Sequence, residues 1–133
     1  VWSVTSYKEL HQDGLETVRW NLLHPTKKPK VPYLTQALAD SSGICVAASD
    51  YVKALPESVS QWVPGRLISL GTDGFGRSET REALRDFFEV DARHIALAAL
   101  TGLLQEGKIE GKTVQAAIKK LGIDPNKVNP LLI

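Results

Sequence analysis

Two short, largely apolar runs of strand length, separated by a segment long enough for a crossover, most constrain how this chain can fold. Ile44–Ala48 is apolar at every position, and Arg66–Leu70 reads as the next strand along the chain. A strand that is buried on both faces shows such a continuous apolar run instead of alternation. Because parallel strands need a crossover connection of this length, the two runs predict a parallel sheet in an α/β fold.

A first helix is predicted ahead of these runs. Ser6 and Glu9 have the spacing of a capping box, which starts a helix directly after the serine. This helix should end near His24, because the proline that follows disfavours helical geometry in the residue before it. One apolar stripe runs along it, formed by Leu15, Val18 and Leu22.

The remaining elements follow from the same kinds of signal. They are a strand over Val1–Thr5, helices over Tyr33–Ala39 and Tyr51–Trp62, a helix capped by Ser78 and running through Phe88, a deeply buried helix capped by Asp91 and closed by Gly107, a helix over Lys112–Leu121, and a turn at Asp124–Pro125. This order predicts three parallel strands joined by right-handed crossovers. The predicted fold is a three-layer α/β domain, with a mainly parallel sheet flanked by helices and a helical tail after it.

Composition limits the size and class of the protein. With 133 residues, 43% hydrophobic and 23% charged, the chain has the composition of one globular domain, which we place at residues 1–133. A net charge of +1 gives no reason to expect nucleic acid or a membrane surface as partner. A three-stranded sheet with an open edge, in a chain without methionine, leads us to expect further strands upstream and a domain cut at its N-terminal side.

The most specific local motif is the loop Gly71–Ser78, with the sequence Gly-Thr-Asp-Gly-Phe-Gly-Arg-Ser. It matches a phosphate-binding loop at every position but one, because Arg77 stands where that loop has lysine. A planar guanidinium does not freely replace a compact ammonium. Glu79 also stands where a dinucleotide-binding fingerprint has its third glycine. Two interpretations stay open: a tight strand-to-helix connection, or a crevice for a phosphorylated ligand.

Other reactive residues form no catalytic set. The single cysteine, Cys45, excludes an internal disulfide, and its apolar run predicts a buried, inert thiol. The histidines lie on separate segments without metal-ligand spacing, and His94 has the setting of a hydrogen-bonded core histidine. The lysines of the loop 25–32 fit a solvated connection better than an anion site. A solvated face explains most of one group of carboxylates, which comprises Asp73, Glu79, Glu82, Asp86 and Glu89.

Several stretches, in order along the whole chain, resemble the C-terminal region of the homodimeric pyruvate dehydrogenase decarboxylating component, a transketolase-like enzyme that depends on thiamin diphosphate. These stretches are residues 1–10, Arg19–Pro25, Ser49–Tyr51, Leu70–Ser78, Phe88–Asp91 and Asp124–Pro130. The resemblance implies a transketolase-like C-terminal domain that packs against the preceding domains and against the partner subunit of a homodimer. It favours the interpretation of the glycine-rich loop as a tight strand-to-helix connection over that of a crevice for a phosphorylated ligand.

The resemblance also implies a function for the parent enzyme. In that family the parent decarboxylates pyruvate on thiamin diphosphate with magnesium, and it passes the acetyl unit to the lipoyl group of a dihydrolipoyl acyltransferase in the cytoplasm. The catalytic, cofactor-binding and metal-binding motifs belong to earlier domains, so the resemblance assigns none of these roles here. It implies that this chain alone binds no cofactor and is inactive.

The candidate loop or interface residues are Gly71, Thr72, Asp73, Gly74, Gly76, Arg77 and Arg81. We expect the three glycines to serve backbone geometry, and the two arginines to make structural or interdomain contacts. Two alternatives remain: a stand-alone α/β module that binds a phosphorylated ligand at Gly71–Ser78, and a different thiamin enzyme of the transketolase family.

Overall fold

The two apolar runs form a parallel sheet, as predicted. In a computed structural model that describes residues 1–41 and 43–133, β1 (Ile44–Ala48) pairs in parallel with β2 (Arg66–Leu70). Ile44 lies opposite Arg66 in the register, and the strands stay paired to their last residues. The crossover between them contains α3 (Ala54–Glu57) and the 3₁₀ helix η1 (Ser60–Trp62). This topology confirms the α/β fold class.

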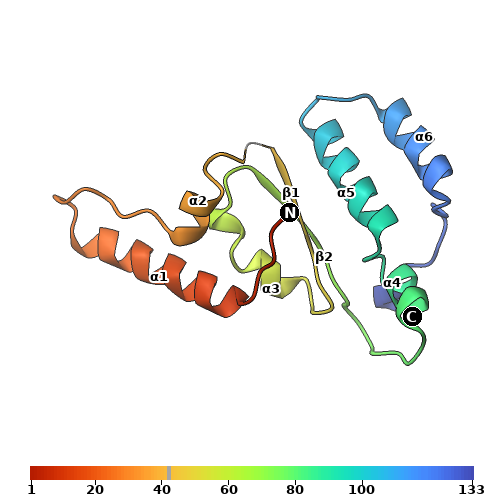
Figure 1. The fold of residues 1–133 in the computed structure, drawn as a ribbon, viewed down its shortest axis with the longest axis horizontal. Coiled ribbons are helices and arrows are strands. Elements are labelled where there is room, and N and C mark those ends of the chain that lie inside the picture. The colour runs from red at the N-terminus through yellow and green to blue at the C-terminus, as the bar shows by residue number, and fades with distance from the viewer. Residues whose placement is uncertain (42) are drawn as a thin grey trace.

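Helices lie on both sides of the sheet and give three layers (Figure 1). On one side are α1 (Tyr7–Leu23), α2 (Tyr33–Ala37) and the crossover helices. On the other side α5 (Ala92–Gln105) packs on both strands, and α6 (Gly111–Leu121) packs on the outside of α5. The short α4 (Arg81–Phe87) connects β2 to α5, and η2 (Pro130–Leu132) ends the chain beside α4.

The packing of α1 differs from the prediction. Its buried residues are Gly14 and Thr17, whereas Leu15, Val18 and Leu22 are 49%, 47% and 76% exposed. A Cβ atom on Gly14 would lie 2.5 Å from the indole of Trp62. The missing side chain therefore lets the helix axis approach the buried tryptophan closely, and this contact turns the apolar stripe away from the interior.

Helix α5 contacts the sheet through small residues. Its buried positions are His94, Ala98 and Gly102, which recur every four residues along one face. A Cβ atom on Gly102 would lie 2.6 Å from Cγ2 of Ile44, so glycine is needed at the point where the helix crosses β1. The other faces are only half-buried or exposed, and Ile95 is 36% exposed. The prediction that α5 is deeply buried on more than one face is therefore wrong for this structure.

Most helix ends follow their sequence signals. The Ser6 hydroxyl accepts a hydrogen bond from the Glu9 backbone N–H at 3.2 Å, and Asp91 caps α5 in the same way through the His94 N–H at 3.0 Å. Gly107 and Gly122 have φ of +70° and +64° at the ends of α5 and α6. The cap of α4 is an exception, because Thr80 takes this role instead of Ser78, by accepting from the Ala83 N–H.

Several predicted elements need correction. Val1–Thr5 lies outside the sheet and exposed to solvent, so the described residues form two strands instead of three. Cys45 consequently lies in a two-stranded sheet with no central strand, and it is half-buried. The predicted helix 33–39 ends at Ala37. The predicted helix 51–62 is divided into α3 and η1, and the fully buried Pro56 lies just before the division.

None of the helices in the described part of the chain is both long enough and apolar enough to cross a bilayer.

Candidate functional site

The first half of the glycine-rich loop is attached to the segment that follows β1. A Cβ atom on Gly71 would lie 2.5 Å from the carbonyl oxygen of Tyr51, so the two backbones approach too closely for any other residue. The Thr72 backbone N–H donates to the same carbonyl at 2.9 Å, and its hydroxyl donates to the Asp50 carbonyl at 2.6 Å. The loop therefore leaves β2 in a fixed direction.

Asp73 adds a second attachment to the crossover. Its Oδ1 accepts a hydrogen bond from the Lys53 backbone N–H at 3.0 Å, and its Oδ2 lies 3.6 Å from the Lys53 ammonium. The carboxylate is thus engaged at the start of α3. These contacts give Asp73 a structural role, because they join the loop to the crossover.

The three glycines of the loop have different roles. Gly74 has φ of +94°, and a Cβ atom there would lie 3.4 Å from the Pro130 carbonyl oxygen. Its conformation and its neighbour both favour glycine, as predicted. Gly71 is required by close approach alone. Gly76 has an ordinary φ and no atom within 4 Å of a Cβ position, so the prediction that it serves backbone geometry is wrong for the described chain.

The second half of the loop extends into solvent. Phe75 is 84% exposed, and the residues through Thr80 are exposed as well. The Arg77 guanidinium lies over the Phe87 ring, 4.4 Å from its centroid. Because α4 begins only at Arg81, Ser78 does not lie at a helix N-terminus, which a phosphate-binding loop requires. The geometry therefore favours a strand-to-helix connection over a phosphorylated-ligand site.

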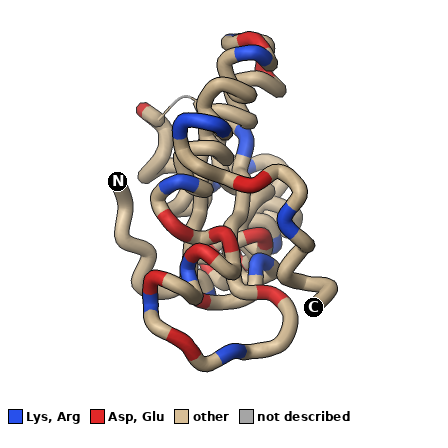
Figure 2. The backbone as a smooth tube through the Cα atoms, turned by 90° about the vertical axis from the view of Figure 1, so that its right-hand side faces the viewer, with Lys and Arg blue, Asp and Glu red and all other residues tan. Residues whose placement is uncertain are grey.

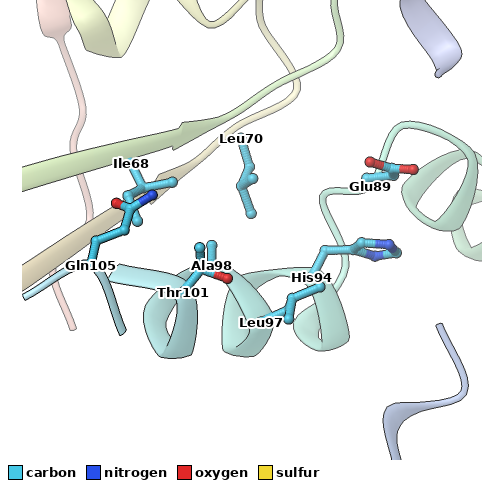
Figure 3. Close-up of a pocket in the computed structure, with 8 residues that line it drawn as sticks. All are labelled: Ile68, Leu70, Glu89, His94, Leu97, Ala98, Thr101 and Gln105. Atoms are coloured by element: carbon cyan, nitrogen blue, oxygen red, sulfur yellow. The ribbon is translucent and has the colours of Figure 1, made fainter. Parts of the chain in front are cut away.

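A cavity of about 260 Å³ lies between β2 and α5 (Figure 3). Ile68 and Leu70 line it from the sheet, and Leu97 and Ala98 line it from the helix. Its polar residues are Glu89, His94, Thr101 and Gln105. The walls are mainly apolar, and these polar groups come from α5 and from the turn before it.

His94 is held in place by the residue that caps its helix. Its Nδ1 lies 2.7 Å from Asp91 Oδ1, and the side chain is buried, as predicted for a core histidine with a hydrogen-bond partner. Arg93 Nε donates to the other oxygen of Asp91 at 2.7 Å, and the same guanidinium pairs with Asp86. Of the five grouped carboxylates, Asp86 thus has a specific structural role that the solvated-face interpretation missed.

The protonation of Asp91 follows from these contacts. Burial alone would raise the pKa of its carboxyl group. The hydrogen bonds from the His94 backbone N–H, the His94 ring and the Arg93 guanidinium outweigh this effect and lower the pKa to about 2. Asp91 is therefore an anion at neutral pH, as a helix N-cap in this network should be.

Lys127 is a residue that the sequence did not single out, and its partner Glu89 stood there only among the carboxylates of a solvated face. Glu89 has φ of +61°, a conformation unusual for a residue with a side chain, in the turn between α4 and α5. The Lys127 ammonium donates to the carbonyls of Asp86 and Phe87 at 2.6 and 3.1 Å and lies 3.7 Å from the Glu89 carboxylate. These contacts attach the last segment of the chain to the end of α4, 40 residues earlier. No local sequence pattern signals them.

The described residues bring together no group of three or more His, Cys, Asp or Glu side chains that could hold a metal ion. Each histidine has its own surroundings: the His11 ring is tilted against Trp62, and the His24 ring stacks on Trp20 at 4.4 Å. The predicted loop residues do lie together, but Thr72 and Asp73 are engaged in structural contacts. Only the exposed second half of the loop is available for a further interaction.

Comparison with known proteins identifies the family. Residues 1–91 match the model of the transketolase-like TK C-terminal domain. The chain is 52% identical, over 98% of its length, to the pyruvate dehydrogenase E1 component of Pseudomonas aeruginosa. It is 47% identical over its whole length to that of Cupriavidus necator and 50% identical over 99% of its length to that of Escherichia coli. The chain spans 15% of the length of each of these relatives. This chain therefore belongs to the transketolase-like C-terminal domain family.

Proposed function

We propose that this chain is the C-terminal structural and dimerisation domain, a single domain over residues 1–133, of a thiamin-diphosphate-dependent pyruvate dehydrogenase. The observation that carries the proposal is the 52% identity to a pyruvate dehydrogenase E1 component, which extends over 98% of the chain. Identity at this level across both the family-matched part and the helical tail supports a common parent, beyond a shared fold. The three-layer arrangement agrees with a domain that packs against others.

The parent enzyme, on this proposal, decarboxylates pyruvate and acetylates the lipoyl group of a dihydrolipoyl acyltransferase in the cytoplasm. Its thiamin diphosphate and magnesium would be held by other parts of the parent. The described side chains form no group of three or more His, Cys, Asp or Glu that fits magnesium. We therefore derive no catalytic step through this chain and assign it no catalytic residue.

Within this function the glycine-rich loop acts as a fixed connection that presents an interface. Gly71, Thr72 and Asp73 attach it to the crossover, and Gly74 allows the turn. Arg77 lies on its exposed second half, and Arg81 is the exposed first residue of α4. We propose that these two arginines contact other domains of the parent.

The test compares three proteins: the full-length parent, the parent lacking the residues of this chain, and the chain alone. We expect pyruvate turnover with thiamin diphosphate, magnesium and the acyltransferase only for the full-length parent. Light scattering should show a dimer for the parent and a loss of dimer when the domain is removed. Turnover by the chain alone, or an active dimer without it, would contradict the proposal. Turnover of another 2-oxo acid or of a ketose in place of pyruvate would indicate a different thiamin enzyme.

A separate titration tests the remaining alternative. Calorimetry of this chain with ATP and with a dinucleotide should show no saturable binding at micromolar concentrations. Saturable binding that Arg77→Ala abolishes would establish the loop as a ligand site and replace the interface proposal.

A further inference from the structure

The exposed half of the glycine-rich loop and the end of the chain form one surface, which we call the loop patch. It consists of Phe75, Arg77, Arg81, Leu131 and Leu132. Phe75 is 84% exposed, and Leu131 and Leu132 are 55% and 75% exposed. A Cβ atom on Gly74, the residue before Phe75, would lie 3.5 Å from Cα of Leu131, so loop and terminus are neighbours. The loop lies at the lower edge of the molecule in Figures 1 and 2.

We propose that the loop patch docks onto an acidic, apolar segment in the preceding part of the same parent polypeptide. This inference rests on the proposed function, which places this chain at the C-terminal end of a longer enzyme. It goes further by naming the surface that makes the contact and the chemistry of the segment that covers it.

The apolar part of the patch is presented by a rigid base. Hydrogen bonds from Thr72 and to Asp73 fix the start of the loop, and Gly74 packs against η2. A large aromatic side chain held outward by a fixed loop loses little conformational freedom when a partner covers it. Exposed aromatic groups with aliphatic neighbours are typical of the buried centre of interfaces.

The charged part of the patch requires an acidic occupant. The Arg77 guanidinium is stacked over Phe87, which fixes its plane and leaves its edge free to donate to a carboxylate. Neither Arg77 nor Arg81 forms an ion pair with any residue that the structure describes. The carboxylates near them in sequence are Asp73, which pairs with Lys53, and Glu79 and Glu82, and no ion pair joins any of the three to Arg77 or Arg81. An incoming carboxylate would pair with Arg77 in a bidentate, charge-assisted contact.

A second copy of the same patch is a poor occupant. In a two-fold contact the same patch is present on both sides, so a self-contact centred on Arg77 would bring two guanidinium groups together. Like charges placed opposite one another in an interface cost several kcal/mol. The relatives are far longer than this chain, which spans 15% of their length, so most of a parent of that length lies outside this chain and can supply the segment.

Photo-crosslinking in the full-length parent tests the proposal. Phe75 is replaced by benzoylphenylalanine, and the same replacement at the exposed Lys28, in the loop after α1, serves as the control. Dimers that contain one isotopically heavy and one light subunit separate contacts within a chain from contacts between chains. We expect a crosslink from position 75 to a peptide of the preceding part of the same chain, with acidic and apolar residues, and none at comparable yield from position 28.

Charge is tested in the same experiment. Arg77→Gln should lower the crosslink yield about tenfold, which corresponds to a loss of about 1.4 kcal/mol. Lys28→Gln should leave it unchanged. A crosslink formed only between subunits, no crosslink at all, or a yield insensitive to Arg77→Gln would overturn the proposal. Pyruvate turnover by the unmodified parent is measured separately, so an inactive parent that still gives the expected crosslink would overturn the proposed function and leave the docking contact established.

Discussion

Gly71 offers a sharp test of the loop geometry. In Gly71→Ala the new Cβ atom would lie 2.5 Å from the Tyr51 carbonyl oxygen and 3.0 Å from the Lys53 backbone nitrogen. Both are backbone atoms that cannot rotate away, so the loop or the crossover must shift and the hydrogen bond from the Thr72 N–H weakens. Overpacking of this kind costs about 1–3 kcal/mol. The smaller entropy of the unfolded alanine chain offsets about 0.4–1 kcal/mol of this.

Gly76→Ala is the matched control on the same loop. Nothing lies within 4 Å of its Cβ position and its φ is ordinary, so only the unfolded-state effect remains. We expect this substitution to be neutral or to stabilise the chain by about 0.4–1 kcal/mol. The two substitutions are chemically identical and five residues apart, so their difference isolates the close approach at Gly71.

Thermal and urea unfolding of the two variants, followed by circular dichroism, gives the free energy of unfolding. At about 4 °C per kcal/mol for a domain of this size, Gly71→Ala should lower the midpoint by several degrees, while Gly76→Ala should leave it unchanged or raise it. A Gly71→Ala variant that is no less stable than Gly76→Ala would refute the described approach of the loop to Tyr51. A loss in Gly76→Ala as large as that in Gly71→Ala would refute the assignment of open space at Gly76.

Three further outcomes are expected. Asp91 has a lowered pKa in the folded chain, so its carboxylate contributes about 2 kcal/mol to the free energy of unfolding above the unfolded pKa near 4, and this contribution is lost as the pH falls toward about 2. Acid unfolding of Asp91→Asn should lack this loss of stability, and an acid-unfolding profile identical to that of the unmutated chain would contradict the role of Asp91. Gly102→Ala should destabilise the chain by about 1–3 kcal/mol in urea, because its Cβ atom would overlap Ile44. Gly111→Ala should not, because its Cβ atom would meet nothing within 4 Å. Equal urea midpoints of the two variants would exclude the described contact of α5 with β1. Cys45 is half-buried, so a thiol reagent should label the native chain more slowly than the urea-unfolded chain, and equal rates would show that the thiol is accessible.

The sequence predicts the local elements well where one residue type determines the geometry. Ser6, Asp91 and Gly122 mark helix ends because a side-chain acceptor or a left-handed conformation is required there. The run Ile44–Ala48 predicts its strand because five apolar residues need cover on both faces. Each of these signals is local, so no knowledge of the tertiary structure is needed to interpret them.

The predictions fail where a distant contact decides between local possibilities. The apolar stripe of α1 indicates a buried face, but the helix packs against Trp62 with its other side, which carries the buried glycine and threonine. Val1–Thr5 has the composition of a strand, yet a strand forms only beside a partner with which it can pair. Ser78 and Thr80 are equally good caps by residue type, but it is Thr80 that accepts a hydrogen bond from the first turn of α4.

The same distinction applies to the candidate site. Sequence alone located the loop and gave reason to doubt nucleotide binding, because Arg77 departs from the phosphate-loop pattern. It could not separate the residues that hold the loop from those that face outward. Asp73 and Glu79 look alike in sequence, but one pairs with Lys53 and the other accepts from a neighbouring backbone N–H. Lys127 and its two carbonyl partners are 41 and 40 residues apart, which no motif can reveal.

The position of α5 has a consequence for how the protein is divided. The family match ends at residue 91, and α5 begins at Ala92. Yet α5 covers one whole side of the sheet, where Gly102 meets Ile44 and where Leu97 and Ala98 face Ile68. A chain that stopped at the boundary of the family would keep both strands and expose their apolar side to water, as a surface prone to aggregation. The part that the family model matches is thus smaller than the part that packs together, because the sheet of the matched part needs α5 from the helical tail to cover it.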